Sequence, residues 1–308
     1  MTSESQIQTS PKRTESNILA WLAYFDIFEH PLREEELYAL AGTKIGQEEF
    51  TEMLEELIQR KMCFRFNGYV GLNNEIDRYV DNRMSKEKEA GRYFSKLPFY
   101  ARLISHFPYV KALAISGSLS KNVIHEDGDI DYFVITSEGR LWICRTFLIL
   151  FKKIFLLNSK KYFCINYFVD ERNLKIPDEN IYTAVEISYL LPVYNSQLID
   201  EMKQTNGWTQ SYLPQFQNPI RFEEVKSKFR PMRLVEFLLN GRHGDYLDLY
   251  LMRGFHSYWR RKFKHFSLEK FELTMRTNRG ISKHHPQNFQ QKVLDEYEGK
   301  LQKLSLDE

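Results

Sequence analysis

The chain has 308 residues, of which 43% are hydrophobic and 15% aromatic, enough for roughly two or three small domains with a sizeable core. Its net charge of +2 argues against a protein that binds polyanions over its whole surface. The three cysteines, Cys63, Cys144 and Cys164, are too few and too widely spaced for a disulfide framework or a zinc site, and they suit a reducing cytoplasm. The first residues are polar, unlike a signal peptide, so we expect a cytoplasmic protein.

No segment predicts a membrane span. The most apolar stretch, residues 141–157, is interrupted by Arg145, Lys152 and Lys153. Crossing a bilayer requires about 20 predominantly apolar residues. We therefore expect no membrane partner.

The beginning of the chain predicts a small helical domain. Residues 1–15 are expected to be disordered, and residues 16–72 to form a compact domain. Apolar residues at helical spacing predict helices over residues 17–28, 33–41 and 47–60. Asn67-Gly68 between two short apolar runs predicts a hairpin, because both turn residues tolerate positive φ.

Three helices followed by a hairpin resemble a winged helix, whose third helix usually enters the DNA major groove. Here that helix is acidic, since it carries Glu48, Glu49, Glu52, Glu55 and Glu56. Carboxylates facing phosphates repel rather than release counterions. The sequence therefore favours a structural or protein-contact role over DNA binding.

The remainder of the chain divides into three parts. Residues 73–106 predict one or two linking helices, broken at Pro98. Residues 107–176 alternate strand and helix, which predicts an α/β (α+β) core with a short mixed sheet. Residues 177–308 predict a mainly helical C-terminal domain, ending in a helix over residues 289–304.

The chemistry concentrates in the α/β core. An apolar strand, residues 110–115, ends at Ser116-Gly117-Ser118. Gly117 lets the backbone approach a ligand closely, and Ser118 and Ser120 offer hydroxyl donors. A helix beginning there would also present free N–H groups, which suit phosphate.

A second strand is expected over residues 129–136. Residues two apart in a strand share a face, so Asp129 and Asp131 point the same way, with Ile130 and Tyr132 on the other side. Two neighbouring carboxylates repel unless a cation lies between them. Hard oxygen ligands of this kind suit Mg²⁺ together with substrate phosphates.

At these residues the chain resembles the DNA polymerase β-like nucleotidyltransferase superfamily. The resemblance rests on an apolar strand, Gly117-Ser118, ten intervening residues and the flanked Asp129-Ile130-Asp131, and it covers about 60 residues. It implies that Gly117, Ser118 and Ser120 contact a nucleoside triphosphate while Asp129 and Asp131 bind Mg²⁺ or Mn²⁺. The alternative interpretation makes Gly117-Ser118 an ordinary turn and Asp127-Gly128-Asp129 a solvated loop.

The family usually carries a third carboxylate on the next strand, and here the sequence departs from it. The central position is Asn166, which cannot act as a base and is expected to contact the nucleotide. Asp170 lies on the same face if the strand alternates regularly. Either Asp170 substitutes as the third catalytic carboxylate, or another region supplies the base, or catalysis has been lost.

Two further segments are basic. Residues 226–283 hold fourteen Lys or Arg against five Asp or Glu, interleaved with aromatics such as Tyr258 and Trp259. This region could bind RNA or an acidic acceptor, although aromatics at helical spacing more often form a core. Within it, a polar loop is expected from Arg276, which could clamp triphosphate or simply lie on the surface. His284 and His285 are adjacent and lack partners for a zinc site.

The sequence thus predicts a metal-dependent transfer of a nucleoside monophosphate to an acceptor hydroxyl. Pyrophosphate is released, and the acceptor is an unidentified small molecule, protein or RNA. The alternative is a catalytically degenerate nucleotide-binding regulator that acts through its winged helix.

Overall fold

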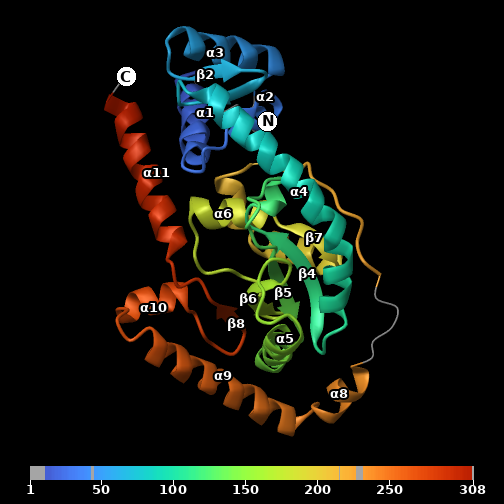
Figure 1. Cartoon of the computed structure of the whole chain (residues 1–308). Coiled ribbons are helices and arrows are strands. Elements are labelled where there is room, and N and C mark those ends of the chain that lie inside the picture. The colour runs from blue at the N-terminus through green and yellow to red at the C-terminus, as the bar shows by residue number, and fades with distance from the viewer. Residues whose placement is uncertain (1–10, 43–44, 215, 227–231, 307–308) are drawn as a thin grey trace, which may run out of the picture. The chain divides into compact units, whose positions relative to one another are not determined.

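A computed structural model describes residues 11–42, 45–214, 216–226 and 232–306. Within these residues the chain is a mixed α/β protein with eleven α-helices and two small sheets (Figure 1). It folds as two compact units. Unit 1 comprises residues 1–85, 210–217 and 291–308, and unit 2 comprises residues 86–209 and 218–290.

Unit 1 begins with three helices and a three-stranded antiparallel sheet with the strand order β1-β3-β2. These elements, in chain order, are α1 (Pro11–Asp26), β1 (Leu32–Arg33), α2 (Glu34–Ala41), α3 (Gln47–Gln59), β2 (Phe64–Phe66) and β3 (Tyr69–Gly71). Asn67 and Gly68 both have positive φ and join β2 to β3, so the expected hairpin turn is confirmed.

The start of α1 differs from the sequence prediction. Disorder was expected over residues 1–15, but α1 begins at Pro11, where proline suits the first helical turn. The expectation for residues 1–10 lies outside the described part of the chain.

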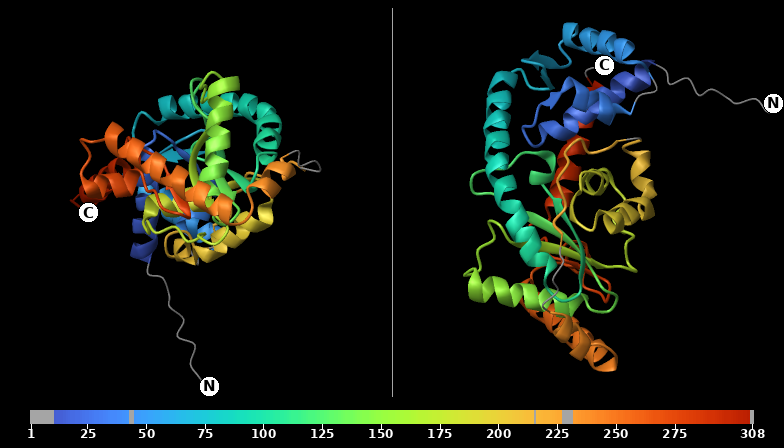
Figure 2. Two further views of the ribbon diagram at one scale, coloured as in Figure 1. Left: turned by 90° about the horizontal axis from the view of Figure 1, so that it is seen from below. Right: turned by 90° about the vertical axis from the view of Figure 1, so that its right-hand side faces the viewer.

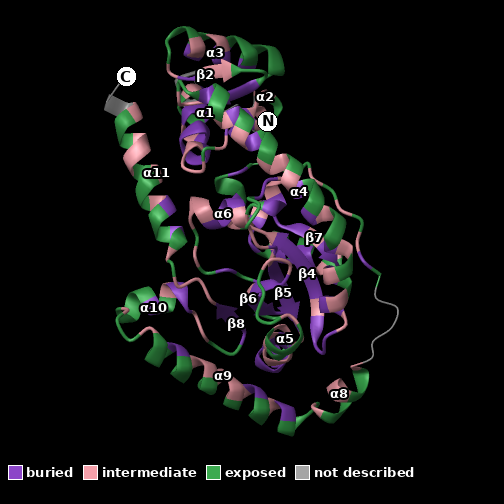
Figure 3. Ribbon diagram, in the orientation of Figure 1, coloured by how far each residue is buried: buried purple, intermediate pink, exposed green. Residues whose placement is uncertain are grey.

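Unit 2 is built on a five-stranded mixed sheet with the order β7-β4-β5-β6-β8, in which only β5 and β6 run parallel. Its strands are β4 (Val110–Ser116), β5 (Asp131–Thr136), β6 (Cys164–Asp170), β7 (Leu191–Tyr194) and β8 (Ile281–Lys283). Strands β7 and β8 come from the segment for which the sequence predicts mainly helices. Figure 3 shows β4 and β5 buried along their lengths.

Helices cover both faces of this sheet. One face packs on α4 (Ile76–Ser105), α5 (Leu141–Phe155) and α9 (Arg242–Lys262), with Trp142 and Tyr132 in the core. The other face packs on α6 (Ile181–Ser188) and α7 (Ser196–Thr205). Figure 2 shows α4 and the α6–α7 pair on opposite sides of the strands. Helices α8 (Arg233–Leu238), α10 (Leu268–Thr274) and α11 (Phe289–Leu306) complete the chain.

Helix α4 corrects the expected break at Pro98. It runs for 30 residues with this proline inside it. Proline removes one helical hydrogen bond and usually bends or ends a helix. Here Leu97, Ala101 and Ile104 are fully buried against the sheet, so tertiary packing on both sides of Pro98 keeps the helix continuous.

No helix among the described residues is long and apolar enough to cross a membrane.

A buried ion pair links α2 to the first part of α4 inside unit 1. Arg83 is 2% exposed and donates two hydrogen bonds of 2.7 Å to the carboxylate of Glu36, and it also donates to the carbonyl of Pro31. Bidentate pairs of this geometry are strong, and breaking one leaves an uncompensated charge.

We expect Arg83→Leu to lower the free energy of unfolding by about 3 kcal/mol. The control is Arg92→Leu on the same helix, which removes an exposed pair with Glu89 and should cost less than about 1 kcal/mol. Urea denaturation of both variants measures the difference. Equal losses of unfolding free energy would show that the buried Arg83–Glu36 pair stabilises the fold no more than the exposed Arg92–Glu89 pair.

Candidate functional site

The Gly-Ser segment lies where β4 ends. Gly117 has φ +67°, and a β-carbon there would lie 3.0 Å from Oδ2 of Asp131. A side chain at position 117 would therefore crowd the Asp131 carboxylate, and only glycine accommodates both this approach and the positive φ without strain. This close approach brings together two motifs that are separated by more than ten residues in the sequence.

Ser118 and Ser120 differ in their availability. Ser118 is exposed, and its hydroxyl makes no capping bond. Ser120 is fully buried and donates a 2.7 Å hydrogen bond to the carbonyl of Gly117, so it holds the loop in place. A three-residue 3₁₀ turn, Leu119–Lys121, follows instead of a helix. The expected helix N-terminus with its phosphate-binding dipole is thus not present at this point.

The two aspartates flank the beginning of β5. Asp131 is the first residue of the strand and pairs with Ser116 on β4 and Cys164 on β6. The sequence predicted a strand from Asp129, but ladder pairing begins two residues later, and Asp129 precedes the strand. Ile130 still exchanges backbone hydrogen bonds with Lys161 and Cys164, so the chain is held there.

The electrostatics of Asp131 favour a cation. Burial, together with the negative charges of Asp129 and Glu186, raises its pKa to about 6, although hydrogen bonds from Cys164 and Asn166 act in the opposite direction. A divalent cation would relieve this repulsion. No cluster of three or more His, Cys, Asp or Glu side chains placed to hold a metal occurs in the part of the chain that is described. Two carboxylates completed by substrate phosphates nevertheless fit Mg²⁺ or Mn²⁺.

Strand β6 contains a bulge that sets the position of Asn166. Tyr132 pairs with Ile165, but Phe133 pairs with Tyr167, so Asn166 is the extra residue. Its Nδ2 lies 3.4 Å from Oδ1 of Asp131 and 2.9 Å from Sγ of Cys164. The structure therefore brings Asn166 and Asp131 together.

Asp170 is not brought to this site. It pairs with Thr136, at the opposite end of β5 from Asp131, and the bulge turns it to the other face of the sheet. Regular alternation, on which its expected catalytic role depends, is interrupted by Asn166. The buried Asp170 carboxylate instead accepts hydrogen bonds from the backbone of Arg172 and from the backbone and side chain of Asn173. It stabilises a turn.

Sequence reasoning missed Glu186, on α6. Its Oε2 accepts a 3.1 Å hydrogen bond from the backbone N–H of Gly117, and its Oε1 accepts one of 2.8 Å from Nζ of Lys121. A third carboxylate thus approaches the loop from a segment 69 residues further along the chain. No local pattern around Glu186 signals this contact, because it depends on the pairing of β7 with β4.

In the basic region, one of the aromatics belongs to the core, as their helical spacing favours, and the expected polar loop is partly ordered as a strand. Trp259 is buried, and the buried guanidinium of Arg145 lies 5.1 Å from the Trp259 ring centroid. Arg276 is paired with Asp178, and Lys283 is 7% exposed in β8, so the expected loop is partly a strand. Burial lowers the pKa of His284 to about 3 and that of His285 to about 4.

No protein-family model, curated protein or solved structure matches this chain.

The raised pKa of Asp131 predicts how an Asn substitution affects stability. Because the pKa of this carboxyl in the folded state, about 6, exceeds its ordinary value of 3.8, its ionisation costs no stability below pH 3.8 and lowers stability increasingly up to pH 6. Asp131→Asn should therefore stabilise the metal-free protein at pH 7.5 by on the order of 2 kcal/mol. The stability gain of the variant over the wild type should be smaller near pH 4. The difference in Tm between the two proteins, measured in EDTA at both pH values, tests this.

The comparison variant is Asp170→Asn, which weakens the hydrogen bonds of a turn and should lower Tm at both pH values. A pH-independent effect of Asp131→Asn would contradict the electrostatic account of the site.

Proposed function

We propose that the chain is a metal-dependent nucleotidyltransferase that moves a nucleoside monophosphate from a nucleoside triphosphate to an acceptor hydroxyl. The observation that carries this proposal is the close approach of Gly117 to the Asp131 carboxylate. Ser118, which is exposed, follows Gly117 in the chain, and Asp129 is two residues before Asp131. The resemblance to the polymerase β-like superfamily supports the same assignment.

In this proposal Asp129 and Asp131 hold Mg²⁺ or Mn²⁺. When bound, such a cation would neutralise charge on the phosphates, which these two carboxylates cannot do themselves. Ser118 offers a hydroxyl to the phosphate oxygens, and the Gly117 N–H becomes available to them when its hydrogen bond to Glu186 opens. Asn166, an uncharged donor beside Asp131, fixes the orientation of that carboxylate. Asp170 has no part in the reaction, because it lies at the other end of β5.

Glu186 is the candidate for the third carboxylate that β6 does not supply. It is close enough to Asp131 to raise the pKa of that group, and it reaches the site from α6. In this role Glu186 would accept the proton of the attacking hydroxyl. Its ion pair with Lys121 must then open when substrates bind.

The second candidate function is a nucleotide-binding regulator without turnover. One observation favours it: the carboxylate of Glu186 already accepts the Gly117 N–H that a phosphate oxygen would use. Glu186 and Lys121 together would then compete with the triphosphate at the loop.

Unit 1 supports a winged-helix-like assignment, which we propose for either function. Three helices and a small antiparallel sheet with a tight hairpin fit that class. The exposed side of α3 is acidic, with Glu48, Glu49 and Glu52, so we propose a contact with a protein rather than with DNA. We further propose a cytoplasmic location and an acceptor that is a small molecule, protein or RNA.

The first test is transfer of label from α-³²P nucleoside triphosphates into cell extract with Mg²⁺ or Mn²⁺. Asp129→Asn and Asp131→Asn should each reduce transfer by at least about a hundredfold, because each loses several kcal/mol of charge stabilisation. EDTA should abolish transfer in the wild type. Asp170→Asn, assayed below its Tm, should transfer at nearly the wild-type rate.

Loss of transfer in Asp170→Asn alone would overturn the assignment of the site. Absence of both nucleotide binding and transfer in the wild type would reject the function.

Glu186→Gln separates the two candidate functions. If Glu186 is the base, the variant should bind the triphosphate and lose transfer by about a hundredfold or more. If Glu186 competes with phosphate, the variant should bind the triphosphate more tightly than the wild type, which itself shows no transfer. Calorimetric titration with triphosphate and the labelling assay together measure both properties.

A further inference from the structure

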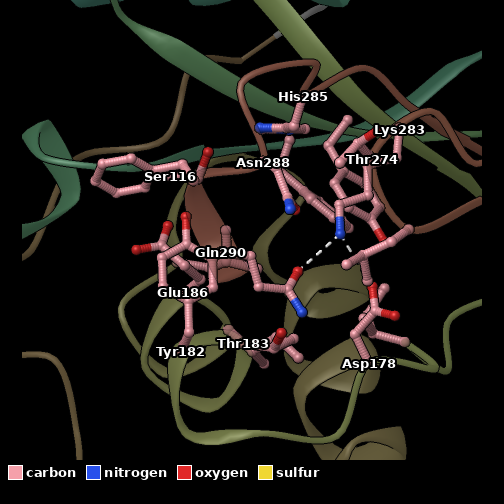
Figure 4. A pocket seen from close by; sticks show the side chains of 17 residues that line it. Ser116, Asp178, Tyr182, Thr183, Glu186, Thr274, Lys283, His285, Asn288 and Gln290 are labelled. Atoms are coloured by element: carbon pink, nitrogen blue, oxygen red, sulfur yellow. Dashed lines mark hydrogen bonds and ion pairs between the residues drawn. The ribbon is translucent and has the colours of Figure 1, made fainter. Parts of the chain in front are cut away.

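Unit 2 contains a pocket of ≈ 100 Å³ on the α6 side of the sheet. We call it the sheet pocket, and it is defined by six of its lining residues: Phe133, Tyr167, Asp178, Lys283, His285 and Asn288. Figure 4 shows Ser116 and Glu186 on one side of it and Asp178 on the other. Because Ser116 pairs with Asp131, the pocket lies directly beside the proposed transfer site.

The walls of the pocket are largely aromatic. Phe133 and Tyr167 are neighbours on β5 and β6 and are stacked with ring centroids 5.3 Å apart. Tyr182 and Phe289 form a second, edge-to-face pair at 6.2 Å. Rings of this kind bury a flat ligand with favourable stacking geometry. The shape and chemistry therefore suit a planar group.

The charges in the pocket compensate one another. Asp178 accepts hydrogen bonds from Arg276, and its Oδ2 lies 3.0 Å from Nζ of Lys283. Lys283 also donates to Gln290, as the dashed lines in Figure 4 show. Burial raises the pKa of Asp178, but the two cations outweigh it and lower that pKa overall. Of the charged side chains that line the pocket, Lys283 is outnumbered by the carboxylates of Asp178 and Glu186, so the lining carries no excess positive charge to hold a phosphate and suits an uncharged group.

Three lining side chains carry a buried polar atom that makes no hydrogen bond of normal geometry within the described residues: Tyr167 Oη, which lies near the Arg276 guanidinium, His285 Nε2 and Asn288 Oδ1. Leaving such atoms unpaired is costly. Two of these residues are held by backbone hydrogen bonds: His285 N–H donates to the Thr274 carbonyl, and Asn288 N–H donates to the His285 carbonyl. His285 is neutral at pH 7, so all three atoms offer uncharged hydrogen bonds.

We infer that the sheet pocket binds the base of the nucleotide, a planar nitrogen heterocycle that stacks on the aromatic walls and hydrogen-bonds to Tyr167, His285 and Asn288. A nucleobase has both donors and acceptors at its ring edge, as these three side chains require. The inference deepens the proposed function, but it does not depend on turnover. The same pocket would serve a catalytically inactive nucleotide sensor.

The test uses adenosine, cytidine, guanosine and uridine as probes, in EDTA, with affinities measured by calorimetry. None carries phosphate, so binding does not involve the metal site. At least one nucleoside should bind, while D-ribose should not. Tyr167→Phe should weaken that binding about fivefold or more, because one hydrogen bond to the base is lost.

Tyr132→Phe is the matched control. Tyr132 also has a buried hydroxyl with no partner in the described part of the chain, but it faces the opposite side of the sheet. Both substitutions remove an unsatisfied hydroxyl, so neither should lower Tm, and only Tyr167→Phe should change nucleoside binding. Equal affinities of the two variants, or no binding of any nucleoside, would overturn the inference.

The variant Asp131→Asn separates a failure of the base-binding inference from a failure of the proposed transferase function. The variant should bind the nucleoside as the wild type does, even though it cannot transfer. Nucleoside binding without any triphosphate transfer would leave the pocket assigned and reject the enzyme. Transfer from the triphosphate without binding of any nucleoside would support the transferase and reject the assignment of the sheet pocket.

Discussion

The pairing of Ser116 with Asp131 is the constraint on which the rest of unit 2 depends. This antiparallel contact between β4 and β5 brings the end of one strand to the beginning of the next. It places Gly117 close to the Asp131 carboxylate, whose ionised form burial disfavours. A shift of one residue in this register would send Asp131 to the opposite face and into the hydrophobic core. The remaining strands extend the sheet outward from this pair.

Hydrophobic packing fixes that register. Ile130, Tyr132 and Val134 are all almost completely buried in the cluster formed with α4 and α5. Three buried side chains in alternation leave Asp131 and Phe133 on the α6 side. The polar site therefore takes its position from the apolar face behind it, and stability and chemistry depend on the same six-residue strand.

The local features of the fold could be predicted from the sequence, and the long-range ones could not. Asn67-Gly68 marks a turn by itself, and an apolar strand leading into Gly117-Ser118 marks a loop by itself. Glu186 carries no such signal, because only the antiparallel contact of β7 with β4 brings α6 to the loop. The polar sequence around the edge strand β8 predicts a loop. In the structure Lys283 is buried with its charge paired to Asp178, and the hydropathy of single residues does not indicate such a pair. The helix break predicted at Pro98 is wrong for a related reason, because packing against the sheet keeps α4 continuous through this proline.

The extra residue at Asn166 has a consequence for how such a site can change over generations. Ile165 and Tyr167 already pair with the consecutive residues Tyr132 and Phe133, so removing that one codon would make β6 pair continuously with β5 and leave every other residue of the strand on its present face. Asp170 would stay at the far end of β5 from Asp131, and Tyr167 would stay in the wall of the sheet pocket. Loss of a single amino acid would therefore remove the amide beside Asp131 without disturbing the core or the pocket.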